Sequence, residues 1–214
     1  MPTFHTTREH LRKLMDTRAL KLPLNTDSVA SYESWKQTLR AKIAELLGMP
    51  LYQSCPLNPQ TLETVQMDGY RRVKMSIDTE PGVTMPFYVL LPDNPSCGKL
   101  PAVLAPHGHV SFGKEAVVGN GTFAQLRETI EAHNYDYGVQ AVKQGIIALC
   151  PDARGFGERR EKYIQGDAPE DKLSSSCQYL NIMAMGLGMN VAGMWTWDLM
   201  RLIDYAQSRD DVDA

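Results

Sequence analysis

The first 54 residues carry apolar side chains at helical spacing. Between Trp35 and Leu47 they recur every three or four positions, which predicts an amphipathic helix with Ser31 as its N-cap. Gly48 is expected to end this helix, because glycine readily adopts the left-handed conformation of a C-terminal cap. We therefore predict a helical extension over residues 1–54 that packs on a larger body, although a partner-binding helix would share the pattern.

A strand pattern follows in the second region, residues 55–214. Residues 70–78 alternate between apolar and polar side chains, as a half-buried strand does. The apolar positions of this strand are Val73, Met75 and Ile77. Residues 80–82, Glu-Pro-Gly, predict a turn, and residues 85–91 predict the returning strand. The second region therefore opens with an antiparallel hairpin.

The pattern changes at residue 100. Residues 100–106 and 146–150 are short, continuously apolar runs, as expected of strands buried on both faces. Residues 137–144 between them predict a helix capped by Gly145, and residues 191–207 predict a last helix. The residues expected to share its buried face are Val191, Trp195, Leu199, Leu202, Ile203 and Ala206. Strand, helix, strand and helix in this order predict an α/β fold whose later strands are parallel.

Composition narrows the class of protein. The chain has 214 residues, 43% of them hydrophobic and 22% charged, which is ordinary for a soluble globular protein. A net charge of −3 without a basic run gives no reason to expect nucleic acid as a partner. No stretch approaches the ~18 apolar residues of a membrane span. The N-terminus has no apolar core of signal-peptide length, so we expect a cytoplasmic protein, although a removed leader would leave no trace here.

The cysteines do not suggest a metal or redox motif. The four of them, Cys55, Cys97, Cys150 and Cys177, are far apart and form no CxxC pair. Cys150 ends an apolar run, where it is interpreted as a small buried hydrophobic residue. None is expected to begin a helix after a strand, as an activated thiol would, so the sequence predicts no catalytic cysteine.

The most informative motif is His107-Gly108-His109, which follows the first buried run directly. A sharp bend at the carboxyl end of such a strand, with a glycine that permits close approach, leaves backbone N–H groups facing the crevice where ligands bind. Esterases need fixed donors of this kind for the oxyanion of a tetrahedral intermediate. The His-x-His spacing also suggests a metal site, but alternate residues of an extended segment point to opposite sides. A backbone donor site is therefore favoured over a metal pair.

A second motif, Pro151 to Arg159, follows the other buried run. Gly155 and Gly157 imply a tight loop at the same edge of the sheet, and Asp152 and Arg154 are interpreted as an ion pair that holds it. The third glycine and the following helix of a dinucleotide fingerprint are missing, so no nicotinamide cofactor is expected.

Together the two motifs resemble the α/β-hydrolase superfamily. Within it, the chain most resembles the acetyl xylan esterase and cephalosporin C deacetylase-like branch, and there the bacterial esterases related to dienelactone hydrolases. The resemblance also includes the leading and the last helix, and covers most of residues 30–214. It implies a partial α/β-hydrolase fold, in which an antiparallel hairpin leads into a parallel sheet flanked by helices, with an N-terminal helical extension.

The resemblance implies roles for particular residues. The backbone N–H of His109 would be an oxyanion-hole donor, Gly108 would allow the approach, and His107 would brace the loop. The residues matching the loop that supports the nucleophile region are Asp152, Arg154, Gly155 and Gly157. The residues placed where such enzymes have their acyl pocket are Met185, Met189 and Trp195. Filling of the core would explain the methionines equally well.

The nucleophile of the family has no counterpart in the sequence. No Gly-x-Ser-x-Gly segment occurs in the chain, and the strand that carries it in the family would begin at Ala214. Residues 174–176, three serines, lie in a polar loop with no strand before them, and His133 is interpreted as a loop residue. The resemblance therefore implies that the nucleophile, acid and base follow residue 214, and that this chain is inactive alone.

The same resemblance has a consequence for the sheet. The strand over residues 100–106 would lie between the Cys150 strand and a strand that follows residue 214. Without that neighbour, an apolar strand becomes an edge, which is prone to pair with other chains. We therefore expect either self-association or a completing C-terminal half at this edge.

The sequence thus predicts that the complete protein hydrolyses a small ester, such as an acetylated carbohydrate. Serine would be the nucleophile, and no cofactor or metal is required. Two alternatives remain open, namely a non-catalytic or split-subunit module for binding or assembly, and a peptidase of the same superfamily.

Overall fold

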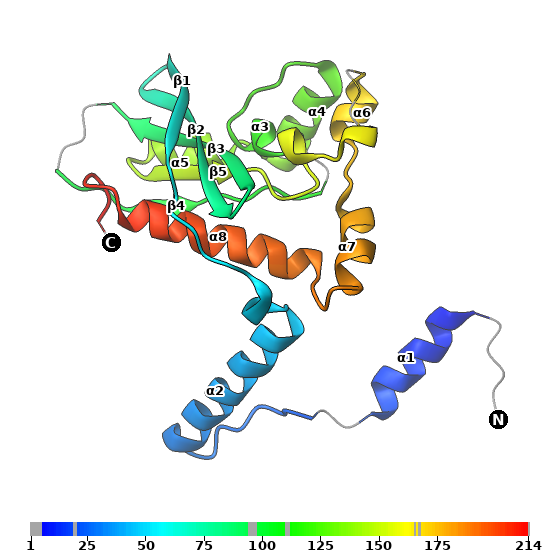
Figure 1. Ribbon diagram of the computed structural model, residues 1–214. Coiled ribbons are helices and arrows are strands. Elements are labelled where there is room, and N and C mark those ends of the chain that lie inside the picture. Colours follow the sequence, from blue (N-terminus) through cyan, green and yellow to red (C-terminus); the bar gives the residue numbers. More distant parts are fainter. Residues whose placement is uncertain are drawn as a thin grey trace. The chain divides into compact units, whose positions relative to one another are not determined.

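The computed structural model describes residues 6–18, 21–93, 98–109, 112–164, 166 and 168–213. The chain divides into two compact units, residues 1–45 and 46–214. Figure 1 labels their helices and strands. Among the described residues, no helix is long and apolar enough to cross a membrane.

The first unit contains helix α1, Thr7–Thr17, and most of helix α2, Val29–Leu46. The helix expected before Gly48 is confirmed, and Gly48 adopts a left-handed conformation with φ of 70° just after it. The N-cap prediction was wrong. Ser28 precedes the helix, which begins at Val29 and therefore before the predicted cap, and the Oγ of Ser28 accepts the backbone N–H of Ser31 at 3.1 Å.

The second unit is built on a five-stranded sheet with the order β1-β2-β3-β5-β4. The strands are β1 Gln60–Gln66, β2 Tyr70–Glu80, β3 Val83–Pro92, β4 Ala102–Leu104 and β5 Ile147–Pro151. Strands β2 and β3 form the expected antiparallel hairpin, and β4 and β5 are parallel, as expected. Strand β1, which the sequence did not predict, adds to the outer side of the hairpin. The predicted α/β fold with parallel later strands is confirmed.

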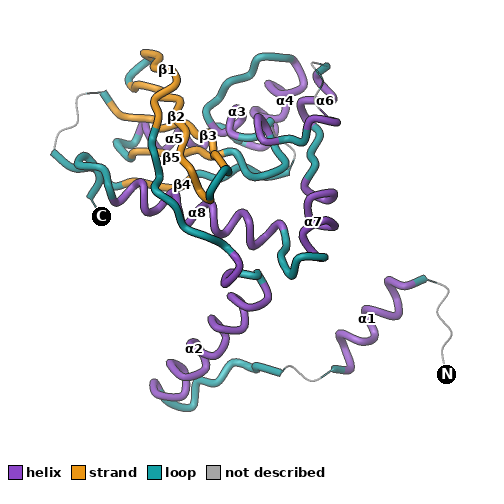
Figure 2. The backbone as a smooth tube through the Cα atoms, viewed as in Figure 1, coloured by secondary structure: helices purple, strands orange, loops and turns teal. Residues whose placement is uncertain are grey.

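The segments of the chain between β4 and β5 and after β5 are mainly helical (Figure 2). The α-helices are α3 Lys114–Val117, α4 Ala124–His133, α5 Tyr137–Lys143, α6 Pro169–Leu173, α7 Cys177–Met185 and α8 Val191–Gln207. The short 3-10 turns are Met49–Leu51, Gly157–Arg159 and Lys162–Ile164. Gly145, with φ of 81°, follows α5 as the predicted cap. His133 is the last residue of α4 and not a loop residue.

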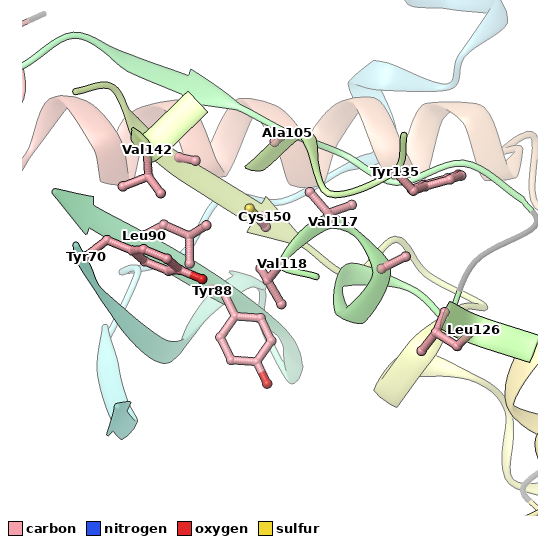
Figure 3. Packing of buried hydrophobic residues seen from close by; sticks show 12 residues of the cluster. Tyr70, Tyr88, Leu90, Ala105, Val117, Val118, Leu126, Tyr135, Val142 and Cys150 are labelled. Atoms are coloured by element: carbon pink, nitrogen blue, oxygen red, sulfur yellow. The ribbon is translucent and has the colours of Figure 1, made fainter. Parts of the chain in front are cut away.

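The core has two layers, one on each face of the sheet. Alternate residues of β5 point to opposite faces, so that Cys150 packs with α5 and the α3–α4 region while Leu149 packs with α8. Figure 3 shows the first layer, where Leu90, Cys150 and Val117 gather from β3, β5 and α3. All five residues of β5 are buried, as the sequence predicted.

The face of α8 was predicted only in part. Leu202 and Ala206 are buried against the sheet, but Ile203 is 43% exposed. Tyr205, which packs edge-on against Phe87 at 5.2 Å, occupies the inner face instead. Residues 202, 205 and 206 follow the helical spacing of three and four, whereas position 203 turns away from their face.

Strand β4 is not buried on both faces, contrary to prediction. It is only three residues long and lies at the end of the sheet, where Val103 is 38% exposed because only β5 flanks the strand. Leu100 just before it forms an isolated parallel bridge with Val212. The N–H of Leu100 donates to the carbonyl of Asp211 at 2.9 Å, and the N–H of Asp213 donates to the carbonyl of Leu100 at 2.8 Å. Residues 211–213 thus pair with Leu100, just before β4, through one isolated parallel bridge.

Candidate active site

Two loops meet where the parallel strands β4 and β5 end. Residues 105–109 follow β4, and residues 152–159 follow β5. Because the carboxyl ends of parallel neighbours lie at the same edge of a sheet, both predicted motifs come together there.

His107 joins the two loops through its ring. Its Nε2 accepts the backbone N–H of Ala153 at 3.1 Å, and its Nδ1 lies 2.8 Å from the carbonyl oxygen of Gly108. Since a backbone N–H can only donate, Nε2 is the acceptor and Nδ1 carries the hydrogen. Burial lowers the pKa of His107, which favours this neutral form.

Two tyrosines fix the backbone of the first loop. The N–H of Gly108 donates to Oη of Tyr135 at 2.7 Å, and Oη of Tyr137 donates to the carbonyl of Pro106 at 2.5 Å. A Cβ at position 108 would lie 2.4 Å from the Tyr135 hydroxyl, so only glycine leaves room for it. Burial raises the pKa of Tyr137, which keeps its phenol protonated as a donor. Sequence reasoning missed both tyrosines.

His109 lies against aromatic rings of two other elements. Its ring packs edge-on against the rings of Phe156 and of Trp195, which lies near the start of α8. The ring centroids are 5.0 Å and 5.9 Å away, respectively. His107 contacts the same Phe156 ring at 5.0 Å. Nε2 of His109 lies 3.6 Å from Sγ of Cys177. The structure therefore brings His107, His109 and Trp195 together around Phe156.

Asp152 does not pair with Arg154, contrary to prediction. It is fully buried, and its carboxylate accepts from Nζ of Lys114 at 2.7 Å and from the N–H of the same residue at 2.8 Å. Glu158 also contacts this ammonium group and donates its N–H to Asp152 at 3.1 Å. Burial alone would lower the pKa of Lys114, but the surrounding carboxylates, Asp152 first, outweigh it and raise the pKa. A buried charge needs such partners, and the partner of Asp152 is Lys114 of α3, which is 38 residues away in the sequence.

Arg154 instead binds two acids from other elements. Its guanidinium contacts Glu80 at the end of β2 at 2.6 Å and Asp198 of α8 at 2.8 Å. The carboxylate of Asp198 also forms an ion pair with the guanidinium of Arg159 at 2.6 Å. Burial would raise the pKa of Asp198, but Arg159 and Arg154 lower it, so the carboxylate stays charged. The loop after β5 is therefore tied to the sheet and to α8 by buried ion pairs.

The two glycines of this loop allow close contacts. Gly155 has φ of 86°, and a Cβ there would lie 2.8 Å from the backbone nitrogen of Cys177. Gly157 has φ of 52°, and a Cβ there would lie 2.3 Å from the Asp152 carboxylate. Both therefore serve packing within the loop region.

A cavity of about 240 Å³ lies beneath the two loops, with a mainly apolar lining. Its lining residues are Met85, Pro106, His107, Pro151, Asp152, Ala153, Trp195, Asp198 and Leu199. Trp195 thus lines this cavity. Met185 is 66% exposed on α7, and neither it nor Met189 lines this cavity.

The remaining candidates take structural partners. Oγ of Ser176 accepts the N–H of Glu161 at 3.1 Å, and Oγ of Ser174 donates to the carbonyl of Asp171 at 2.6 Å. Among the described residues, no group of three or more His, Cys, Asp or Glu side chains is arranged to hold a metal ion.

Comparison with known proteins gives the family. Residues 4–196 match the model of the Abhydrolase family, whereas no curated protein matches the chain. A candidate acetyl xylan esterase from Bacteroides fragilis has a similar structure, with a TM-score of 0.78 and 20% identity. The similarity covers 98% of this chain and 52% of the other, so the chain spans about half the length of that protein.

A second solved structure, described as Methylesterase BT1017, has a TM-score of 0.52 and 21% identity over 96% of this chain and 37% of its own. At these identities the likenesses concern the fold, which is a mixed sheet flanked by helices as in part of an α/β-hydrolase. The family match extends over nine-tenths of the sequence, from the N-terminal helices into α8, and the chain belongs to the Abhydrolase family of α/β-hydrolases.

Proposed function

We propose that the complete protein is a serine carboxylic-ester hydrolase, and that residues 106–109 of this chain form part of its oxyanion hole. The observation that carries the proposal is the backbone N–H of His109, which donates to none of the residues that the structure describes. The bonds of Gly108 to Tyr135 and of His107 to Ala153 hold the loop in place. A fixed, unpaired donor matches what a developing oxyanion requires.

The size of the cavity favours a substrate with a small acyl group. Its volume of about 240 Å³ and its apolar lining suit a short acyl chain better than a long one. An acetyl ester of a carbohydrate fits this size, and the structurally similar protein from Bacteroides fragilis is described as a candidate acetyl xylan esterase. Serine would attack the ester carbonyl, without a metal or cofactor.

The nucleophile would come from a segment outside these 214 residues, since they contain no Gly-x-Ser-x-Gly segment. The test is hydrolysis of p-nitrophenyl acetate by this chain and by a version extended past Ala214. We expect turnover only from the extended protein. Equal and high turnover by the short chain would refute the proposal.

The role of the His109 N–H is tested in the extended protein by a matched pair of substitutions. His109→Pro removes the backbone donor, and His109→Ala removes only the imidazole. Loss of one oxyanion donor costs about 100- to 1,000-fold in kcat, so the proline variant should lose far more than the alanine variant. Equal losses would assign the effect to the side chain or to the fold.

A second candidate function is a split-subunit or assembly module. The position of β4 at the end of the sheet, with Val103 38% exposed, favours it, because a strand of another chain would pair at such an edge. Activity restored by mixing this chain with a separate C-terminal half would support it. A peptidase of the same superfamily would use the same loop, and cleavage of an acyl p-nitroanilide in preference to the ester would favour that reaction.

A further inference from the structure

Cys177 and His109 form a close pair beside the candidate active site. Cys177 is the first residue of α7, and its Sγ lies 3.6 Å from Nε2 of His109. A thiol within reach of an imidazole, with the imidazole held by other groups, is the arrangement of an activated nucleophile. The proposed ester hydrolysis uses neither side chain.

Separate elements hold both partners in place. The ring of His109 packs edge-on against Phe156 and Trp195. The start of α7 is fixed because the N–H of Ser176 donates to the carbonyl of Gly155 at 2.9 Å, and because Gly155 has no Cβ to displace the backbone of Cys177. The 3.6 Å separation therefore does not depend on one mobile side chain.

The sulfur has polar surroundings and is accessible from solvent. The free N–H groups at the start of a helix carry partial positive charge, and α7 has nine residues. Oγ of Ser175 lies 3.4 Å from Sγ and adds a hydroxyl neighbour. Cys177 is partly exposed, so small reagents reach it, whereas Cys150 is fully buried and burial raises its pKa.

We propose that Cys177 is a covalent modification site for small soft electrophiles, with His109 as its general base. With iodoacetamide, Sγ attacks the methylene carbon, so that the C–S bond forms while the C–I bond breaks. Iodide leaves with the bonding electron pair, and the thiol proton passes to Nε2 of His109. The step needs no oxidant and no bound metal.

The test is the alkylation rate of each cysteine, measured by peptide mass spectrometry in native and in urea-unfolded protein with iodoacetamide. The built-in control is Cys55, which is also partly exposed. General-base assistance typically contributes about 100- to 10,000-fold, so Cys177 should react at least about tenfold faster in the folded than in the unfolded protein. Cys55 should react no faster folded than unfolded. Equal folded-to-unfolded ratios at the two cysteines would overturn the proposal.

Two substitutions separate the base from its surroundings. His109→Asn should remove the advantage of Cys177, and Ser175→Ala should change its rate by less than about twofold, because a hydroxyl is a poor base at neutral pH. Continued protection of Cys150 shows that each variant is folded. An unchanged rate in a folded His109→Asn variant overturns the proposal, and if that variant unfolds, the wild-type comparison with Cys55 decides. Because this readout is labelling, it does not depend on ester hydrolysis.

Discussion

His107 links the stability of the site to pH. Burial lowers its pKa in the folded chain, so the unfolded chain takes up the proton first as the pH falls. An ordinary histidine titrates near pH 6.5, so stability should fall by up to about 1.4 kcal/mol per pH unit below that value, until the folded form titrates. This loss of stability is absent well above pH 7, where His107 is neutral in both the folded and the unfolded chain. Urea unfolding at pH 7.5 and 5.5 measures it.

The matched control is His107→Gln, whose side-chain carbonyl can still accept the Ala153 N–H but has no titrating group. The variant should lose less stability than the wild type between the two pH values. An identical loss in both proteins would show that other groups govern the pH dependence.

At the same scale, the sequence located the His107-Gly108-His109 loop but not what holds it. Gly108 was expected to allow a close approach to the loop, and its missing Cβ also makes room for the Tyr135 hydroxyl. Tyr135 lies 27 residues further along the chain, in a loop with no motif. A local pattern shows that a glycine is needed, but only the fold shows which neighbour requires it.

Among the elements, the strongly apolar ones were predictable and the weakly apolar ones were not. Strand β5 is buried throughout and stood out as a continuous apolar run. Strand β1 is mostly exposed, joins the sheet through its backbone and has few apolar residues, so it gave no signal. The ion pairs of Arg154 escaped prediction because its partners Glu80 and Asp198 are 74 and 44 residues away.

Asp198 anchors α8 to the rest of the second unit, and its loss should be costly. Asp198→Asn leaves Arg159 and Arg154 without the shared carboxylate in a buried setting. Breaking a buried ion pair in this way costs about 3 kcal/mol or more. The free energy of unfolding in urea measures the loss.

Asp204→Asn on the same helix is the control. Asp204 pairs with Arg201 at 2.6 Å, but its side chain is 49% exposed, so its loss should cost less than about 1 kcal/mol. Similar costs for the two variants would mean that the buried network does not hold α8.

At the scale of the whole molecule, the exposed edge of β4 is the place where we expect this chain to associate with other chains. Val103 is 38% exposed there, and the described chain pairs only residues 211–213 with Leu100 beside it. An apolar strand with unpaired backbone groups tends to pair with another chain. We therefore expect this chain to associate as its concentration rises, as light scattering coupled to gel filtration would measure. Val103→Lys should reduce the association, because a charge on an edge strand opposes pairing.

A comparison with the extended protein distinguishes association through the edge of β4 from non-specific association. If residues after Ala214 form the next strand beside β4, the extended protein should stay monomeric without any change at Val103. Val103→Lys should then destabilise it, because the lysine would be covered by that strand and its charge left without a partner. A short chain that stays monomeric at all concentrations, with a sharp cooperative melt, would contradict the open edge. Opposite effects of one substitution in the two proteins would identify β4 as the strand that the additional residues of the extended protein cover.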